Sequence, residues 1–410
     1  MINNEMNAYK NFNRLLITAF LISFFCVQSC VEPFKITIKQ EQSYLIVDGS
    51  VTDLENSQPI SLFETSADFT YRSTEFTATI TPNLKDIVAV TGAKVEVLEN
   101  ETKTIVLNEI EPGYYQFPAG FKGKIGNNYK LRILKTDGKN YASNNEKLQA
   151  IPEIGTLYDV LNQKGIEDPK GSNGRMQTID LFVDFVDPPT ERNFYRWKWT
   201  LYEPQNICAT CKQAIYEEKT VTGNTIEACV NDPTIPGANI FDYFCKTNCY
   251  DIIYGNNIEI FSDAFIDGQT QYDKRVAQVP FYQSNPGLLV VQQHAISSDA
   301  YRYYKLIQDQ SVNSGSIADT PPSALKGNLI NQNNPLEIVL GYFTASSVYE
   351  LKYNLSKSSR VLGPYGGEKD GLFKYFNNRY PIPEVPNDKR PIIPFAQCKK
   401  SLFRTPILPL

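Results

Sequence analysis

The sequence predicts a mainly β protein: an N-terminal β-sandwich of immunoglobulin or transthyretin type, then a larger β-rich domain with one helix and a disulfide-stapled insertion. Three observations predict this class. Many short runs alternate apolar and polar residues, 23 glycines and 25 prolines supply turns, and tyrosine (25) and phenylalanine (23) far outnumber methionine (3). Aromatic residues favour strands, whereas glycine and proline favour turns.

The first 29 residues have the layout of an export signal. Lys10 and Arg14 precede a short apolar run, residues 15–27, which falls short of the roughly 20 residues that cross a bilayer. The following Val27-Gln28-Ser29-Cys30 resembles a lipobox. We therefore predict that residues 1–29 are removed, that Cys30 is acylated and holds the protein on a lipid bilayer, and that residues 30–42 form a tether. The alternative is an ordinary secretory signal whose Cys30 joins a disulfide.

Length and charge limit the function classes. A chain of 410 residues suggests two or three domains. The formal net charge is −5, and the signal removes one net positive charge from the mature chain. Nucleic-acid binding needs a basic face, and no cluster of lysine and arginine is visible, so we predict no nucleic-acid partner.

Residues 43–150 are predicted to form the β-sandwich. Alternating runs occupy residues 44–51, 93–100 and 128–136, and in the last run Tyr129, Leu131 and Ile133 share one face. Glycine turns, such as Asp137-Gly138, separate the strands.

Residues 151–362 are predicted to form the second, larger domain. In residues 193–202 the core face holds Tyr195, Trp197, Trp199 and Leu201, opposite Arg196 and Lys198. Both tryptophans are interpreted as core; the alternative, a sugar-stacking platform, would require them to be exposed. The run 176–189 places four further apolar side chains on one face: Ile179, Leu181, Val183 and Phe185.

The later part of this domain combines strands with one helix. Strands are predicted at residues 286–296, 336–343 and 348–355. Between the first two, Ser298 is predicted to cap a helix, and one buried face is expected to hold Ala300, Tyr303, Tyr304 and Ile307. Residues 363–410, rich in proline and glycine, are predicted to be an extended tail that Cys398 pins to the domain.

Six cysteines remain once Cys26 leaves with the signal and Cys30 is acylated, and five of them lie in the predicted insertion, residues 203–275. An even number in an exported chain indicates three disulfides, with 15 pairings that the sequence leaves open. Zinc is the alternative, because Cys208-x2-Cys211 and Cys245-x3-Cys249 have the spacing of metal ligands. The export signal favours disulfides. The candidates are Cys208, Cys211, Cys229, Cys245, Cys249 and Cys398.

Catalytic motifs are scarce in the sequence. The single histidine, His294, lies in an apolar strand and is interpreted as a core residue. One histidine cannot supply a His-Glu-x-x-His zinc site, and no phosphate loop or dinucleotide-binding glycine motif is present. Two-carboxylate glycosidase chemistry needs no histidine and stays open. We predict a protein that is not an enzyme and has no cofactor or metal.

Several segments resemble one family. Cys30-Val31-Glu32-Pro33-Phe34, "LIVDGSVTD" (45–53), "NFYRWKW" (193–199), "VVQQHAISSDAYRYYKLIQDQ" (290–310) and "PPSALKGNLINQNNPLEIVLGYFTASS" (321–347) are similar to the Bacteroidota outer-membrane lipoproteins known as domain of unknown function 4249. The resemblance implies an accessory protein of TonB-dependent transporters, large barrels with a plugged lumen, and implies no enzymatic activity.

The expected function is therefore association with a TonB-dependent transporter at the outer membrane, on the cell surface rather than the periplasmic face, with help in substrate capture or uptake. The recognition surface is predicted on the insertion, at Tyr243, Phe244, Tyr250 and Tyr254, because a stapled loop holds aromatic rings in place. The alternative for these rings is a small core of the insertion. Alternative functions are a freestanding surface adhesin or structural lipoprotein, and a glycan- or peptide-processing enzyme.

Overall fold

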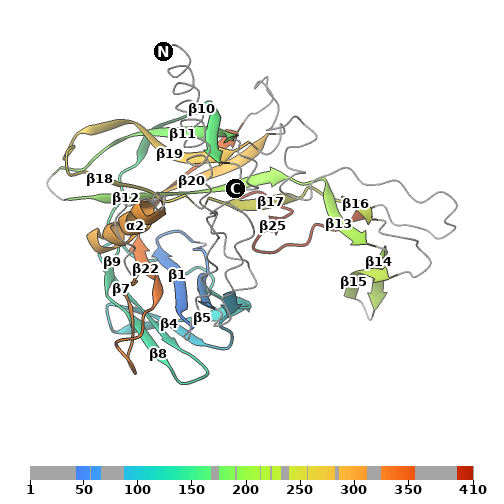
Figure 1. Cartoon of the computed structure of the whole chain (residues 1–410), viewed down its shortest axis with the longest axis horizontal. Coiled ribbons are helices and arrows are strands. Elements are labelled where there is room, and N and C mark those ends of the chain that lie inside the picture. The colour runs from blue at the N-terminus through green and yellow to red at the C-terminus, as the bar shows by residue number, and fades with distance from the viewer. Residues whose placement is uncertain are drawn as a thin grey trace, which may run out of the picture. The chain divides into compact units, whose positions relative to one another are not determined.

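Strands dominate the computed structural model, which confirms the mainly β fold class (Figure 1). All described residues lie within one compact unit. The structure describes residues 43–55, 57–65, 87–167, 175–189, 192–212, 214–221, 224–231, 240–255, 257–281, 286–311, 325–355 and 395–409.

The first sandwich is built from short strands whose inward side chains share one core. The predicted inward face of residues 128–136 is confirmed, because Tyr129, Leu131 and Ile133 are fully buried. Gly113 and Gly138 have positive φ angles of 80° and 86° in the turns that join neighbouring strands. The strands that precede residue 150 are β1 (Leu45–Thr52), β2 (Ile60–Thr65), β3 (Ile87–Ala89), β4 (Lys94–Glu99), β5 (Lys103–Glu111), β6 (Tyr114–Gln116), β7 (Asn128–Leu134), β8 (Asn140–Ser143) and β9 (Glu146–Lys147).

Strand β5 joins the two layers of this sandwich. Its first half, to Leu107, pairs with β4, and its second half, from Asn108, pairs with β6. A strand that changes sheets in this way closes one corner of a sandwich. The two layers thereby enclose one core, which includes Val47, Val95 and Leu131.

Two strands from much later in the chain complete the first sandwich. β21 (Leu329–Asn331) pairs with β8, and β22 (Leu340–Ser346) runs parallel to β1. Gly341, with φ of 86°, permits the close approach to β1, because a Cβ there would lie 1.8 Å from the Val47 carbonyl oxygen. β22 begins four residues later than predicted, since the preceding Leu336 is 91% exposed in a turn.

The second sandwich packs two sheets around the tryptophans. Trp197 and Trp199 lie in its core with exposures of only 1% and 6%, as predicted, and Phe185 packs edge-on against Tyr195. One sheet holds β10 (Ile154–Glu167), β11 (Arg175–Val186) and β19 (Thr270–Pro280). The other holds β12 (Phe194–Pro204), β17 (Tyr250–Tyr254), β18 (Glu259–Ser262), β20 (Gly287–Ala295), β23 (Val348–Leu355) and β25 (Arg404–Thr405).

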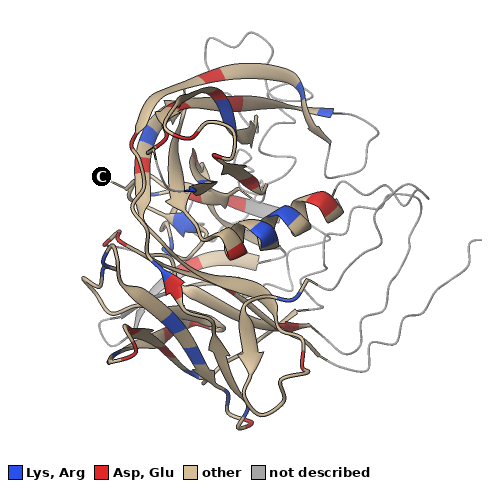
Figure 2. Cartoon of the chain, turned by 90° about the vertical axis from the view of Figure 1, so that its left-hand side faces the viewer, with Lys and Arg blue, Asp and Glu red and all other residues tan. Residues whose placement is uncertain are grey.

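The helix α2 (Ser298–Ser311) follows β20, as predicted, and buries Ala300 and Tyr304. The prediction that Ser298 caps it is wrong by one residue: the Ala300 amide donates a 3.2 Å hydrogen bond to Ser297 Oγ. Two serines in sequence are equally suitable caps, and only the backbone path selects one. Charged side chains follow one another along the helix (Figure 2), and Lys305 pairs with Asp309 at 2.6 Å.

The disulfide-stapled insertion leaves the second sandwich after β12 and returns at β17. Its entry and exit are adjacent, because the Gln205 amide donates a 2.8 Å hydrogen bond to the Cys249 carbonyl oxygen. The later part of the predicted insertion, residues 250–275, supplies strands to the sandwich instead. The strands of the insertion are β13 (Ile207–Lys212), β14 (Ala214–Val221), β15 (Asn224–Asn231) and β16 (Ile240–Cys245), joined by β24 (Phe395–Ala396) from the C-terminal segment.

Candidate functional site

A cleft of about 270 Å³ lies where the first sandwich faces the outer side of β12 and β17. Asp48 and Tyr114 come from the first sandwich, and Lys198 and Tyr254 from the second. A smaller pocket, which shares Asp48 and Lys198 with the cleft, continues toward His294. The cleft is therefore a concave site built on rigid strands, as ligand sites commonly are.

The alternation of β12 places two cations in this cleft. Tyr195 and Trp197 point into the sandwich core, so Arg196 and Lys198 point to the opposite face. Cross-strand pairing sets His294 beside Arg196 and Gln292 beside Lys198. The result is a polar patch on the outer side of the sheet, of which the first sandwich covers a part.

Neither cation has a carboxylate partner within ion-pair distance in the described part of the chain. The Arg196 guanidinium lies 3.9 Å above the Tyr304 ring, a cation–π contact that leaves its Nε atom buried without a hydrogen-bond partner. Burial, and secondarily the charge of Arg196, lowers the pKa of Lys198 to about 8, although Asp48 acts in the opposite direction. The cleft thus has a surplus of positive charge.

Trp199 forms one wall of the cleft although it belongs to the core. Gly255 makes this position possible, because a Cβ at residue 255 would lie 2.5 Å from the indole Nε1 atom. That Nε1 atom is buried and has no hydrogen-bond partner. An unpaired buried donor is costly to the folded state.

His294 is buried at 5% exposure, as predicted for a core histidine. Its Nδ1 atom lies 3.1 Å from Ser346 Oγ, which in turn lies 3.2 Å from Ser50 Oγ. Burial, together with Lys198 and Arg196, holds its pKa well below the usual value, so the ring is neutral. Its Nε2 atom is buried and has no hydrogen-bond partner in the described part of the chain, and other atoms of the residue line the smaller pocket.

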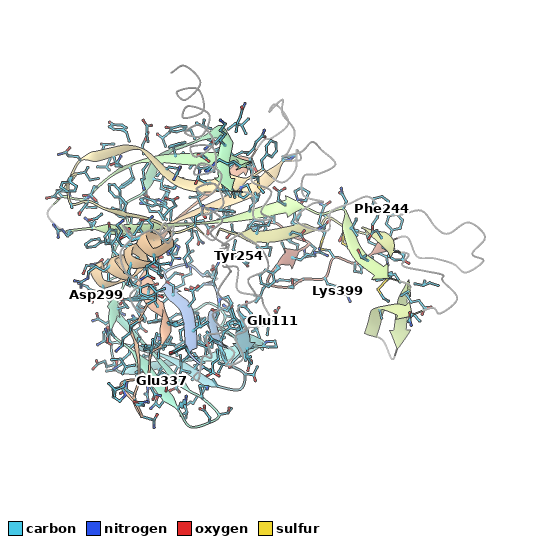
Figure 3. All side chains as sticks on the ribbon, in the orientation of Figure 1. Glu111, Phe244, Tyr254, Asp299, Glu337 and Lys399 are labelled. Carbon is cyan, nitrogen blue, oxygen red and sulfur yellow. A yellow bond between two sulfur atoms is a disulfide. The ribbon has the colours of Figure 1, made fainter. Side chains whose placement is uncertain are left out.

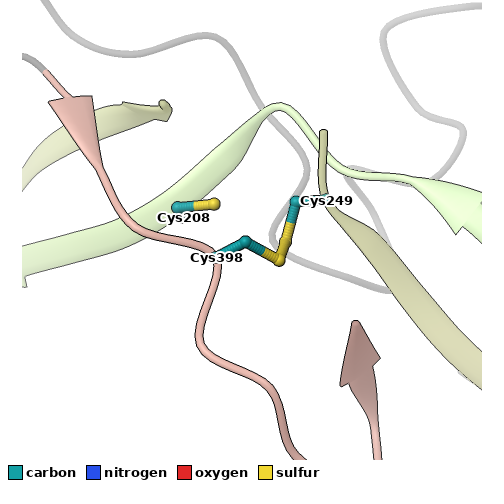
Figure 4. Close-up of side chains that lie close together, drawn as sticks. All are labelled: Cys208, Cys249 and Cys398. Atoms are coloured by element: carbon teal, nitrogen blue, oxygen red, sulfur yellow. A yellow bond between two sulfur atoms is a disulfide. The ribbon is translucent and has the colours of Figure 1, made fainter. Parts of the chain in front are cut away.

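Three disulfides are present, as predicted, and their pairing could not be read from the sequence. The bonds are Cys208–Cys245, Cys211–Cys229 and Cys249–Cys398. Figure 4 shows Cys208 beside the Cys249–Cys398 bridge, and the three sulfur atoms lie within 4.8 Å of one another. With all six sulfurs bonded in pairs, no thiolate is free to bind zinc in this state, so the structure favours disulfides over the zinc alternative.

The four aromatic residues predicted as a recognition surface do not come together. Tyr243 is buried in the core of the insertion, where its hydroxyl accepts a 3.0 Å hydrogen bond from the Tyr216 amide. Phe244 is 38% exposed and its ring neighbours that of Phe395. Tyr250 is partly buried at the start of β17, where it pairs with Pro204 of the second sandwich. Figure 3 labels Phe244 near β16 and Tyr254 near β17.

Tyr254 alone of these four lines the cleft. Its hydroxyl donates a 2.7 Å hydrogen bond to the Leu402 carbonyl oxygen, and its ring packs edge-on against Phe403. The C-terminal segment therefore forms part of the cleft wall. The Cys249–Cys398 disulfide and the pairing of β25 with β17 hold that segment in place.

One feature of the sequence indicates this site indirectly. Arg196 and Lys198 alternate with core aromatics, which places both cations on the outer face of a strand, but a cationic outer face is ordinarily solvated. That β1 would cover this face depends on a parallel pairing between residues about 300 positions apart, Ile46 and Leu340 among them. No local pattern encodes such a pairing.

The predicted membrane attachment lies outside the described residues. This applies to residues 1–29, to Cys30 and the tether, and to residues 363–394 of the predicted tail. Within the described part of the chain, no helix combines the length and apolar character that a bilayer-crossing helix requires.

Comparison with known proteins identifies the family. Residues 31–352 match the model of a domain of unknown function, DUF4249. No curated protein and no solved structure matches the chain. Because the match covers most of the chain, from the residue after Cys30 into β23, this protein belongs to the DUF4249 family.

Proposed function

We propose that this protein is a lipid-anchored, non-enzymatic protein of the outer membrane that associates with a TonB-dependent transporter and captures substrate for it. The observation that carries the capture role is the cleft, where Arg196 and Lys198 have no ion-pair partner among the described residues and the Trp199 indole N–H is unpaired. Such groups lower their free energy by binding a ligand.

The chemistry of the cleft supports binding rather than turnover. Ser346 is hydrogen-bonded to the lone histidine, but it is completely buried and out of reach of a substrate. His294 lies beside two cations that oppose its protonation. A general base needs access to the proton that it removes, and neither side chain has that access.

The membrane location and the partner rest on the sequence. The signal and the lipobox at Cys30 support acylation, and the tether 30–42 could extend roughly 40 Å from the bilayer. The family resemblance supports the transporter as partner. In this proposal the stapled insertion docks on the transporter, and its disulfides keep it rigid.

The adjacent entry and exit of the insertion allow a clean test. We would replace residues 207–247 with a short glycine linker, which leaves Gln205 beside Cys249 and preserves the Cys249–Cys398 bridge. Membranes of cells that express the wild type or this deletion would be solubilised gently, and co-purifying barrels identified by mass spectrometry. We expect a TonB-dependent transporter with the wild type and at least tenfold less with the deletion.

A second variant tests the anchor. Cys30→Ala should release the protein from the outer-membrane fraction and abolish transporter co-purification, because the lipid confines the two proteins to one surface. A wild-type protein that purifies with lipid attached but with no barrel would instead indicate the freestanding adhesin. An unmodified amino terminus in the purified wild type would contradict the anchor itself.

A further inference from the structure

We propose that the cleft recognises the carboxylate of a monoanionic ligand that has a flat apolar body. The inference deepens the proposed capture role and rests on it. The charge of the cleft and its unpaired donors indicate the carboxylate. Its aromatic walls indicate the flat apolar body.

The net charge of the cleft fits one negative charge. Arg196 and Lys198 supply two positive charges and the exposed Asp48 supplies one negative charge. A carboxylate would leave the site neutral, whereas a dianionic phosphate would leave it negative and would also be repelled by Asp48. A planar guanidinium matches the two oxygens of a carboxylate, and the Nε–H of Arg196 has no partner among the described residues.

The two unpaired donors belong to residues that precede and follow Lys198 on β12. Arg196 Nε and Trp199 Nε1 are both buried without partners, and both residues line the cleft with Lys198 between them on β12. Trp199 is only 6% exposed, so its indole N–H does not form a hydrogen bond with bulk water. Donors held by a strand and a core ring are preorganised, which limits the entropy lost on binding.

The rest of the cleft is aromatic. Tyr114 and Tyr254 line it together with Phe403, whose ring is 56% exposed. The volume of about 270 Å³ lies just below the range of sites for drug-sized ligands. We therefore assign the apolar walls to a flat body of one ring and a short side chain, next to the carboxylate site.

The test uses the purified mature protein and three probes of increasing apolar size: acetate, benzoate and 3-phenylpropionate. Each is compared with its neutral amide at constant ionic strength, and phenyl phosphate serves as the dianion. A ligand that binds only the folded state raises the melting temperature with concentration. We expect benzoate and 3-phenylpropionate to raise it, with at least tenfold higher apparent affinity than their amides and than phenyl phosphate.

Two variants locate the effect. Lys198→Met and Arg196→Met should each weaken 3-phenylpropionate binding at least tenfold, measured by calorimetric titration. Lys352→Met is the matched control, because Lys352 lies on β23 of the same sheet, on the same face, and is exposed outside the cleft. If one cleft variant does not fold, the other still decides the question.

The pH profile provides a second readout. A bound carboxylate favours the charged form of Lys198, whose pKa in the free protein is about 8, so affinity should fall as pH rises above 8 and should not change there in Lys198→Met. The other titratable or charged groups around Lys198 are Asp48, Tyr114, Arg196, Tyr254, His294 and Glu350. Burial raises the pKa of Tyr114 and of Tyr254 and holds the pKa of His294 well below its usual value, so these three side chains stay neutral from pH 6 to 8.5.

The proposal is overturned if none of the three carboxylates binds better than its amide, or if both cleft variants bind as the wild type does. Tighter binding of phenyl phosphate than of 3-phenylpropionate would also overturn it. These outcomes are independent of the proposed function, because the titration contains no transporter. Loss of transporter co-purification with intact carboxylate binding would overturn only the partner.

Discussion

The buried charge of Lys198 destabilises the folded protein. This residue lies in the middle of β12 and has no ion-pair partner among the described residues, and burial lowers its pKa to about 8. Residues held at a cost to stability are commonly found where a protein binds or acts. The cost can be measured directly.

We predict that Lys198→Met raises the free energy of unfolding at pH 7 by roughly 1–3 kcal/mol, because one pKa unit corresponds to about 1.4 kcal/mol. The folded pKa lies below the ordinary value of 10.5. The unfolded chain therefore binds the proton more tightly, the penalty is full below pH 8, and it disappears as pH rises to 10.5. Urea unfolding at pH 7 and 10 measures both effects.

The Lys352→Met variant gives the baseline for this comparison, since it removes an exposed lysine from the same sheet. A Lys198→Met protein that is less stable than the wild type at pH 7 would contradict the prediction. That result would mean that the lysine has a stabilising partner in solution.

Gly255 shows a second residue-scale requirement. Any side chain at this position would collide with the Trp199 indole, 2.4 Å from its Cε2 atom. The glycine thus serves the position of a tryptophan on the neighbouring strand, and nothing in the residues around it indicates this.

Glu146 connects elements of the first sandwich with α2. Its carboxylate is almost fully buried and accepts hydrogen bonds from Ser297 Oγ at 2.8 Å, Tyr342 OH at 3.0 Å and Asn328 Nδ2 at 3.3 Å. Ser297 also caps α2. One carboxylate therefore positions a helix start and a strand of the neighbouring sheet.

Glu146→Leu should lower the free energy of unfolding by about 2–4 kcal/mol, because it leaves the three donors buried without an acceptor. Glu146→Gln keeps an acceptor oxygen and should cost less. Chemical denaturation at pH 7 compares the two. Equal stability of the leucine variant and the wild type would show that the three donors find other acceptors.

The glutamine variant also tests the titration of Glu146. Burial, as the largest cause, raises the pKa of this carboxyl above its ordinary 4.5. A raised pKa contributes stability that is full below 4.5 and is lost as pH rises through the folded value. Stability of the wild type should therefore fall relative to Glu146→Gln as pH increases above 4.5.

The Cys249–Cys398 bridge acts on the C-terminal segment. It joins residues separated by 149 positions, so in the chain-entropy description its loss costs about 5 kcal/mol. Cys249→Ser with Cys398→Ser should also release β25 and the Phe403 wall of the cleft, and so weaken 3-phenylpropionate binding. Thermal unfolding and calorimetric titration measure the two effects.

The control for this variant is the double serine replacement of Cys211 and Cys229. Their separation is 18 positions, which predicts a smaller cost of about 3 kcal/mol. This bridge lies within the insertion, so the cleft should bind as before. Equal losses of binding in both double variants would contradict a specific role of the C-terminal segment.

At the scale of the whole molecule, the first sandwich depends on the end of the chain. β22 supplies the parallel partner of β1, and Val339, Phe343 and Ala345 belong to the first core. The Val348 amide also donates a 2.8 Å hydrogen bond to the Asp53 carboxylate. Residues 43–150 alone would expose this core and the free edge of β1.

We therefore predict that residues 43–150, expressed alone, do not unfold cooperatively, whereas the complete mature protein does. Circular dichroism melts and amide spectra compare the two. A sharp transition and dispersed amide signals for the fragment would contradict the prediction and would show that β21 and β22 are dispensable.

Local patterns of apolar and polar residues predicted the strands and the helix well. The burial of Tyr129, Leu131 and Ile133, and of both tryptophans, follows from alternation alone, because a strand places every second side chain on one face. The helix after Ser297 follows from its period and its cap. Alternation could not predict whether Tyr243 and Tyr254 lie together. Closeness in sequence does not determine which strand each ring belongs to or which face of that strand it occupies.

Local patterns in the sequence specify the strands, their buried faces, the helix and the presence of paired cysteines, because each depends on neighbours within a few positions. The disulfide partners, the placement of β22 beside β1 and the cleft around Lys198 are set by the three-dimensional packing of the chain. These depend on contacts between residues far apart in the chain, and their free energy arises only when both segments are folded.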